Sequence, residues 1–167
     1  MSQWVAGLVV LLVVPVLFAL MWWGWRGRAR RQGDVAAPAL VPPAERGAAL
    51  LEPVDGTYVS SVRAGDWLDR VVVHGLGVRS GATLQAWPAG LWFERDGAPD
   101  VFVPAADVRA VRVETGIAGK YTVGDGLLVV RWSCGGTELD TGFRPRRWAD
   151  AAVLAATLQP LVPGGQP

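Results

Sequence analysis

The uncharged stretch from Trp4 to Trp25 constrains this chain more than any other feature of its sequence. It reads WVAGLVVLLVVPVLFALMWWGW, and none of its 22 side chains is charged. A helix rises about 1.5 Å per residue and a bilayer's hydrocarbon core is about 30 Å thick, so this length predicts a membrane-spanning helix. Tryptophans at both ends suit the headgroup region, and we interpret four of them as the membrane anchor: Trp4, Trp22, Trp23 and Trp25.

A basic cluster directly follows the apolar stretch, whereas the three residues that precede the apolar stretch carry no basic side chain. The cluster predicts that the N-terminus lies outside and that the C-terminal portion is cytoplasmic, which makes the chain a single-pass protein of the inner (plasma) membrane. A cleaved secretory signal is the alternative, but it would need a basic start and small residues where Trp-Trp-Gly-Trp-Arg stands. The arginines also suit anionic lipid, although a topology signal already explains them: Arg26, Arg28, Arg30 and Arg31.

The formal net charge of +1 hides a split along the chain. Residues 1–48 hold five arginines and two acidic residues, a balance of +3, whereas residues 49–167 hold 11 basic and 13 acidic residues, a balance of −2. Nucleic-acid-binding domains normally present a clustered positive face, so we expect no nucleic acid partner. Cys134 is the single cysteine, which excludes an internal disulfide.

The remaining sequence divides into a linker, one domain and a short tail. We expect the membrane helix within residues 1–25, a basic and then Ala/Pro-rich linker at 26–48, a domain at 49–162 and a tail at 163–167. Segments rich in β-branched and aromatic residues, separated by Gly, Pro and Asp turns, predict seven to eight antiparallel strands. Nine candidate segments supply these seven to eight strands: 57–62, 70–75, 82–87, 91–95, 100–104, 108–114, 120–123, 127–132 and 137–143.

The end of the domain has a helical pattern. Apolar residues recur at helical spacing after Pro145, and Pro160 marks the expected end, so we predict a helix at about 146–159. The apolar face predicted for this helix consists of Trp148, Ala151, Ala152, Ala155 and Leu158.

The order of strands followed by one C-terminal helix resembles the pleckstrin-homology-like (PH-like) domains of bacteria. VFVPAADVRAVRVE and the closing TGFRPRRWADAAVLAATL carry this resemblance, and with the N-terminal helix the chain is similar to small actinobacterial membrane-anchored PH-like proteins, some of them loosely labelled as export or transporter proteins. The resemblance implies a mainly β domain of two near-orthogonal antiparallel sheets capped by the C-terminal helix.

The resemblance also bears on lipid binding. Phosphoinositide-binding members of the wider fold cluster basic residues on the first two strands and the loop between them. Here RAGDWLDR supplies only Arg63 and Arg70, interleaved with Asp66 and Asp69, which argues against specific phosphoinositide binding. Protein partners bound at strand edges or beside the terminal helix are the other common use of the fold.

Residues capable of catalysis or metal binding are scarce in this sequence. His74 and Cys134 are the only histidine and cysteine, and no CxxC or HExxH spacing is present, so we expect no catalytic residue, metal or cofactor and no enzyme activity. GLGVRSG at 75–81 and GIAGKYT at 116–122 depart from the dinucleotide and phosphate-loop patterns, and we interpret both as turns.

Adjacent aromatic residues at 92 and 93 must point to opposite faces of their strand, so one ring leaves the core. Another part of the chain, the bilayer or a partner could cover that ring. We therefore name a candidate partner surface that also includes the exposed basic cluster near the last strand: Trp92, Phe93, Arg144, Arg146 and Arg147.

From these features we expect a single-pass membrane protein whose cytoplasmic PH-like domain serves as a protein-binding or scaffolding module. Its partners would be the bilayer and another membrane or cytoplasmic protein, brought together by confinement at one surface. The alternative is an accessory subunit of a membrane transport or export complex, with the small residues Ala6, Gly7 and Ala19 as a helix-packing surface.

Overall fold

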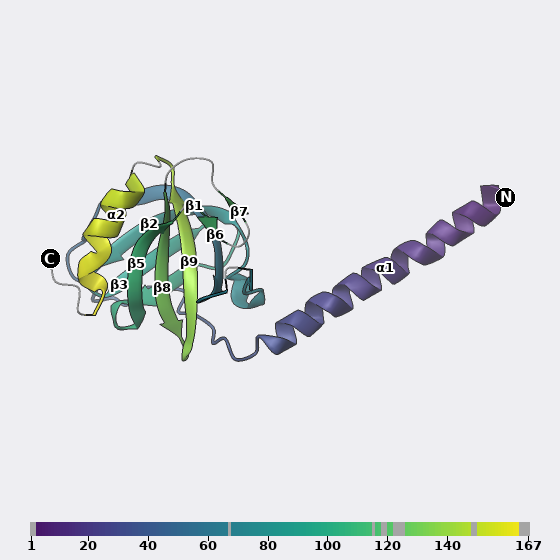
Figure 1. The fold of residues 1–167 in the computed structure, drawn as a ribbon, viewed down its shortest axis with the longest axis horizontal. Helices are drawn as coiled ribbons and strands as arrows, with labels where there is room; N and C mark the ends of the chain where they lie inside the picture. Colours follow the sequence, from purple (N-terminus) through teal and green to yellow (C-terminus); the bar gives the residue numbers. More distant parts are fainter. Residues whose placement is uncertain are drawn as a thin grey trace. The chain divides into compact units, whose positions relative to one another are not determined.

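The computed structural model describes residues 3–66, 68–114, 116–117, 120–121, 126–147 and 150–163. Within these ranges it describes the backbone alone at positions 3, 5, 6, 8, 25, 28, 29, 31, 116, 117, 120 and 121. The chain divides into two compact units, Met1–Gly33 and Asp34–Pro167 (Figure 1).

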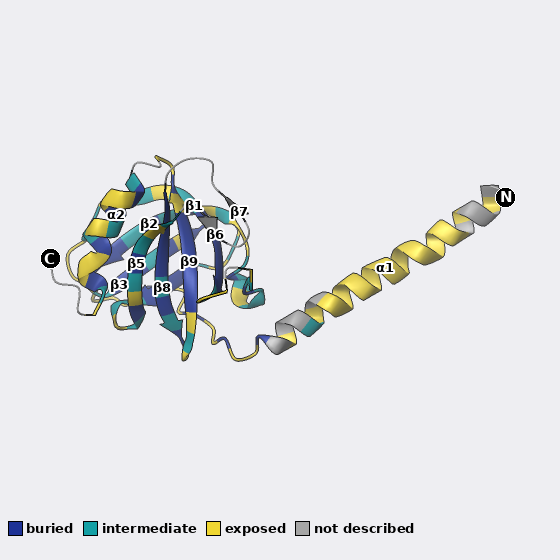
Figure 2. Ribbon diagram, in the orientation of Figure 1, coloured by how far each residue is buried: buried dark blue, intermediate teal, exposed yellow. Residues whose placement is uncertain are grey.

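The first unit contains one helix, α1 (Gln3–Arg31), with Pro15 inside it. Large apolar side chains between Val9 and Trp23 are exposed along the helix (Figure 2). The guanidinium of Arg26 lies 4.7 Å above the ring of Trp22. Within the described part of the chain, no helix combines the length and apolar character needed to cross a membrane. Among the predicted anchor and topology residues, the side chains at positions 25, 28 and 31 lie outside the described residues.

The second unit is mainly β, with seven antiparallel strands in one sheet and a C-terminal helix. The seven strands are β1 (Val54–Arg63), β2 (Ser80–Trp87), β3 (Gly90–Arg95), β4 (Val101–Pro104), β5 (Val108–Glu114), β8 (Leu127–Cys134) and β9 (Thr137–Pro145). Their order is β4-β3-β2-β1-β9-β8-β5 (Figure 1). A separate two-stranded ribbon is formed by β6 (Gly116–Ile117) and β7 (Lys120–Tyr121).

The sheet is continuous because β1 is shared by its two halves. The first residues of β1 pair with β2, and the strand pairs with β9 as far as Arg63, with a register shift between Tyr58 and Ser60. A bulge of this kind bends a strand, so one sheet can change direction without dividing. The prediction of two near-orthogonal sheets is therefore corrected: the seven strands of the domain's main sheet are hydrogen-bonded into one, apart from the β6-β7 ribbon. The edge strands β4 and β5 are joined by the turn η2 (Ala105–Asp107) alone, so the sheet must curl.

Glycine is required where β1 and β9 approach most closely. A Cβ atom added to Gly56 would lie 2.4 Å from the carbonyl oxygen of Arg144 and 2.5 Å from the ring of Phe143. Any larger residue at position 56 would separate the two strands at the centre of the sheet.

The inner face of the curled sheet holds the main core. Its largest fully buried side chains include Trp132, Tyr58, Phe93 and Phe143. A buried chain of hydrogen bonds runs through it: Tyr58 OH and Ser61 Oγ are 2.6 Å apart, Ser61 Oγ and Thr141 Oγ1 2.7 Å, and Trp132 Nε1 donates to Thr141 Oγ1 at 2.8 Å. These bonds satisfy the polar ends of the two aromatic rings, which would otherwise be costly to bury. Burial raises the pKa of the Tyr58 hydroxyl.

The strand predicted at 70–75 is not formed. Arg70 makes an isolated bridge to Val62, and the turn η1 (Val73–Gly75) follows, with His74 at a φ of 56°. The β-branched run RVVVHG favoured a strand, but a left-handed residue next to Gly75 turns the chain away from the sheet. Only Lys120 and Tyr121 of the strand predicted at 120–123 are described, as β7.

The C-terminal helix α2 (Asp150–Leu158) contacts β5, β8 and β9 (Figure 1). It buries Ala151, Leu154 and Leu158, and the turn η3 (Gln159–Leu161) with Pro160 follows it. The predicted apolar face was partly wrong: Ala152 is exposed, whereas Leu154 is buried. Trp148 lies outside the described residues.

Candidate protein-interaction surface

Residues 34–50 run along the domain as an irregular segment with one β-bridge, and we call this segment the strap. We predicted a linker between membrane and domain over residues 26–48, which includes most of this range. In the structure the strap is held from Asp34 onward, chiefly by donors of the domain that bond to its main-chain carbonyl oxygens. The accepting residues are Asp34, Val35, Ala36, Ala39, Leu40 and Arg46.

Side chains of the domain hold the first three residues of the strap. His74 Nε2 lies 2.9 Å from the carbonyl oxygen of Val35, and Cys134 Sγ donates to that of Ala36 at 3.3 Å. Thr137 Oγ1 donates to the carbonyl oxygen of Asp34 at 3.4 Å. The only histidine and cysteine of the chain therefore fix two consecutive carbonyls of one segment.

An ion pair adds to these contacts at the same end of the strap. The guanidinium of Arg63 donates to both carboxylate oxygens of Asp34, at 2.8 and 2.7 Å, and its Nε lies 3.1 Å from Asp69 Oδ2. The hydrogen bonds from Arg63 hold the pKa of the Asp34 carboxyl below its usual value. Arg63, one of the two basic residues considered for phosphoinositide binding, is thus already paired with two carboxylates.

Strands β3 and β4 bind the middle of the strap. The amide of Phe102 donates to the carbonyl oxygen of Ala39 at 2.7 Å, and the two residues form a β-bridge at the edge of the sheet. Trp92 Nε1 donates to the carbonyl oxygen of Leu40 at 3.2 Å. The strap therefore meets both an unpaired strand edge and an aromatic side chain of the outer face.

The end of the strap lies against β2 and the turn that follows it. The guanidinium of Arg46 lies 4.8 Å above the ring of Trp87, which stacks against Trp92 with 6.4 Å between ring centroids. Two backbone bonds complete the attachment, from the Ala89 amide to the carbonyl oxygen of Arg46 at 3.3 Å and from the Leu50 amide to that of Ala86 at 2.9 Å.

Three side chains of the strap are buried, while most of its other residues are exposed. The buried residues are Val35, Pro38 and Pro42. The strap also passes close to the turn between β8 and β9, where a Cβ atom added to Gly135 would lie 2.4 Å from Cβ of Ala36. Gly135 has a φ of 58°, so glycine is favoured here by its conformation as well as by the space.

Trp92 and Phe93 point to opposite faces of β3, as the alternation along a strand predicted. Phe93 is fully buried and packs against Tyr58 and Phe143, whereas Trp92 is half-buried on the outer face beneath the strap. Of the two rings, only Trp92 can therefore contribute to an outer surface, and part of the same chain covers it.

The three arginines of the candidate partner surface are exposed and follow one another closely at the end of β9. Arg144 lies opposite Thr57 of β1, and the amide of Arg146 donates to the carbonyl oxygen of Asp55 at 2.9 Å. Because β2 and β1 separate β3 from β9, the sheet does not bring Arg144, Arg146 and Arg147 together with Trp92.

The surroundings of Cys134 do not favour a nucleophile. The residue is buried, and burial, with a further contribution from Asp107, raises the pKa of its thiol, whereas a reactive cysteine needs a lowered pKa. In the described ranges, no group of three or more His, Cys, Asp or Glu residues is placed to hold a metal ion.

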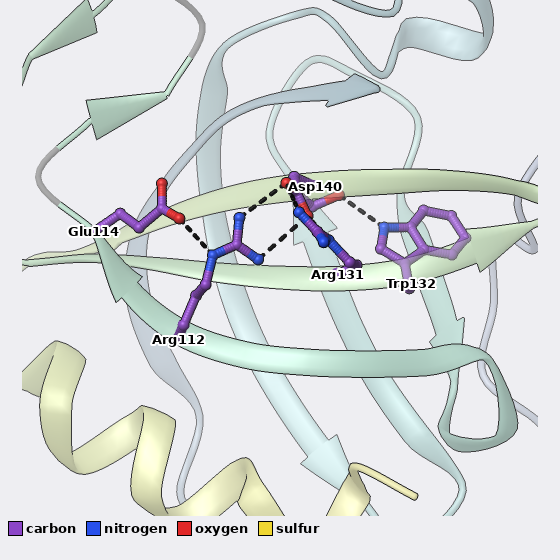
Figure 3. A network of polar contacts seen from close by, with 6 residues as sticks. Arg112, Glu114, Arg131, Trp132 and Asp140 are labelled. Carbon is purple, nitrogen blue, oxygen red and sulfur yellow. Dashed lines mark hydrogen bonds and ion pairs between the residues drawn. The ribbon is translucent and has the colours of Figure 1, made fainter. Parts of the chain in front are cut away.

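A charge network that the sequence analysis did not identify lies on the outer face of β5, β8 and β9. Asp140 is buried and accepts hydrogen bonds from Arg112, at 2.8 and 3.3 Å, and from Arg131, at 2.8 and 2.9 Å; Arg112 also binds Glu114 (Figure 3). Burial alone would raise the pKa of the Asp140 carboxyl, but the two arginines outweigh it and hold that pKa below its usual value. With two charges of each sign the network is balanced, so it does not form an anion site.

Arg95 is a second residue that sequence reasoning missed. It is buried, and its guanidinium donates to Ser80 Oγ and to the carbonyl oxygens of Gly75, Val78 and Pro99, at distances of 2.6 to 3.2 Å. It also lies 3.9 Å above the ring of Tyr58. Arg95 thus organises the glycine-containing loop before β2, where the sequence analysis placed turns. Little in the sequence indicates this role for Arg95, because a charged residue at the end of a strand usually faces water.

Comparison with known proteins agrees with this architecture. A search of curated proteins gives no match to the chain. Residues 36–159, which include most of the strap, the whole seven-stranded sheet and α2, match the family described as Bacterial PH domain-like. The chain therefore belongs to the Bacterial PH domain-like family.

Proposed function

We propose that this chain is a single-pass membrane protein that presents its PH-like domain to the cytoplasm as a protein-binding module. One observation above all supports protein binding: the domain already holds an irregular polypeptide segment, the strap, by its main-chain carbonyls. Domains that bind such segments combine main-chain hydrogen bonds with separate contacts for individual side chains.

The sequence of residues 4–25 supports the membrane anchor. No residue of this stretch is charged, and this holds also for the positions whose side chains the structure does not describe. Exposed apolar side chains along α1 would be costly in water and would be favoured in lipid. The arginines at 26, 28, 30 and 31 would remain on the cytoplasmic side.

A topology reporter fused after Pro167 tests the anchored arrangement. We expect activity of a cytoplasmic reporter only, together with recovery of the full chain in carbonate-washed membranes. Recovery of the chain in the soluble fraction, or activity of a periplasmic reporter, would contradict the proposal. A matched variant with Arg26, Arg28, Arg30 and Arg31 replaced by Gln should lose the orientation preference but keep its membrane association.

The second candidate is an accessory subunit of a membrane transport or export complex, and one observation favours it. Gly7 of α1 has open space around it, with nothing within 4 Å of an added Cβ atom, so another helix could approach closely there. Replacing residues 4–25 by an unrelated apolar helix separates the two functions. A tethered module should keep its activity in the cell after this exchange, whereas a subunit that depends on helix contacts should lose it.

A further inference from the structure

We propose that the surface beneath the strap is a binding site for an extended, proline-containing apolar segment of a partner protein, with the strap as its intramolecular competitor. This inference rests on the proposed function, because it gives the protein-binding module a site and a partner chemistry. The site comprises the outer face of β2 and β3, the edge of β4 and, where Val35 enters the main core, the side chains of His74, Cys134 and Thr137.

The hydrogen bonds between the domain and the strap run mainly in one direction, from donors of the domain to carbonyl oxygens of the strap. Six strap residues accept bonds through their carbonyl oxygens, and the donors include the side chains of His74, Trp92 and Cys134. Every residue has a main-chain carbonyl, so these bonds do not depend on the strap's own side chains. Prolines fit such a segment well, because they lack the N–H group that the site would otherwise have to satisfy.

The buried side chains of the strap are separated by exposed residues. Val35, Pro38 and Pro42 are buried, whereas the residues between them are exposed, including Leu40 at 52% and Val41 at 69%. The buried positions are three and four residues apart, and Val35 belongs to the main hydrophobic core, so the strap inserts single side chains at separate points of the domain. The site therefore selects Val-x-x-Pro-x-x-x-Pro or a similar apolar pattern, and Trp92, which stacks on Trp87, holds the main-chain carbonyl of Leu40 between the two prolines.

The strap is not a helix or a strand, so it lacks the regular backbone hydrogen bonds of such an element. Its one β-bridge is at Ala39, and its first residue is held by the exposed Asp34–Arg63 pair. A tethered segment of this kind has an effective concentration on the order of millimolar. A free partner would therefore compete poorly, whereas a partner confined to the same membrane would compete well. Weakening the Asp34–Arg63 pair should favour the partner.

The first experiment measures binding of a labelled peptide with the sequence of residues 34–43, DVAAPALVPP, to the full chain in mild detergent by fluorescence anisotropy. We expect Asp34→Asn to bind the peptide roughly tenfold more tightly than the unaltered chain, because its strap is released more often. Adding Trp92→Ala to Asp34→Asn should remove that gain. A peptide of the same composition with Val35, Pro38 and Pro42 moved to other positions should bind roughly tenfold more weakly. Equal binding of both peptides, or no peptide binding by Asp34→Asn, would overturn the inference.

The second experiment separates a ligand from an integral part of the fold. A protease site is placed in the full chain at exposed Ala44, and the purified chain is cut there. We expect residues 1–43 to stay bound and to leave when excess peptide 34–43 is added. After the peptide is washed out, the remaining domain should stay folded, with a thermal transition lower than that of the intact chain because the contacts of the strap are lost. Unfolding of the domain on displacement would show that the strap is core structure and would refute the inference. Because neither experiment depends on orientation in the membrane, their failure leaves the topology result for the proposed function standing.

Discussion

The indole Nε1 of Trp92 donates a hydrogen bond to the main-chain carbonyl oxygen of Leu40, 52 residues earlier in the chain and 3.2 Å away. This bond joins the centre of the outer face to the segment that leads into the domain. It also explains why an aromatic residue that points away from the core is only half-exposed.

Replacing Trp92 by Phe should remove this bond while keeping most of the ring. We expect a loss of about 1 kcal/mol in the free energy of unfolding, measured by urea titration, because one hydrogen bond is lost. Proteolysis within the exposed residues 43–45 should become faster. Val113→Ala, on an exposed side chain of β5, is the control and should leave proteolysis at 43–45 unchanged.

Asp140→Asn should destabilise the domain by about 2 kcal/mol at pH 7, because it removes the carboxylate that pairs with both Arg112 and Arg131. Partial solvation of the two arginines keeps this loss moderate. Since the folded pKa of Asp140 is lowered, its contribution is complete above the unfolded pKa of about 3.9 and is lost as the pH falls through the folded value. Urea titrations from about pH 2 to about pH 7, a range that includes the unfolded pKa, should therefore show a shallower acid decline in the variant. Glu138→Gln, exposed on the same strand, should keep the full decline.

Arg95→Lys should cost about 3 kcal/mol although the charge is retained, because an ammonium group cannot reach the four acceptors that the planar guanidinium binds. The matched control is Arg79→Lys, an exposed position in the same loop, which should change stability by less than about 0.5 kcal/mol. Equal effects at both positions in thermal unfolding would contradict the organising role of Arg95.

The Cys134 thiol should react with a maleimide reagent at least about tenfold more slowly in the folded chain than in urea, because burial raises its pKa and the strap covers it. Gly135→Ala should accelerate labelling, since the new Cβ atom would meet Ala36. Gly136→Ala is the control: it has a similarly strained φ of 91° but nothing within 4 Å of the added atom. Equal acceleration by both variants would show that turn strain, not the approach to the strap, controls access.

Leu154→Ala on α2 should destabilise the domain by about 2 to 4 kcal/mol, because Leu154 is 5% exposed and packs in the core. Val153→Ala, the adjacent residue with 65% exposure, should change stability by less than about 0.5 kcal/mol. Thermal unfolding of both variants checks this assignment of the buried face. A larger effect at Val153 would mean that the opposite side of the helix is packed.

The parts of the fold that the sequence predicted are those with a local pattern. Alternation along β3 placed Trp92 and Phe93 on opposite faces, and the β-branched segments with turns between them indicated an antiparallel sheet with one helix after it. The segment at 70–75 was wrongly predicted as a strand, because the positive φ of His74 cannot be inferred from the residue types in this segment.

The strap could not be predicted in the same way. Its contacts use main-chain carbonyls, which leave no trace in the sequence of residues 34–50, and its donors lie far away along the chain. The Asp140 network was missed for a related reason: Arg112, Arg131 and Asp140 meet only through the pairing of three strands.

The sequence distance between the strap and its donors has a consequence for synthesis on the ribosome. Asp34 and Ala36 are among the first residues of the domain to be made, yet they bind Thr137 and Cys134, which follow 103 and 98 positions later. The earliest part of the domain must therefore wait for almost the last strand before it can dock. Until then its apolar side chains remain open to chaperones, so this end of the domain is where we expect nascent-chain quality control to act.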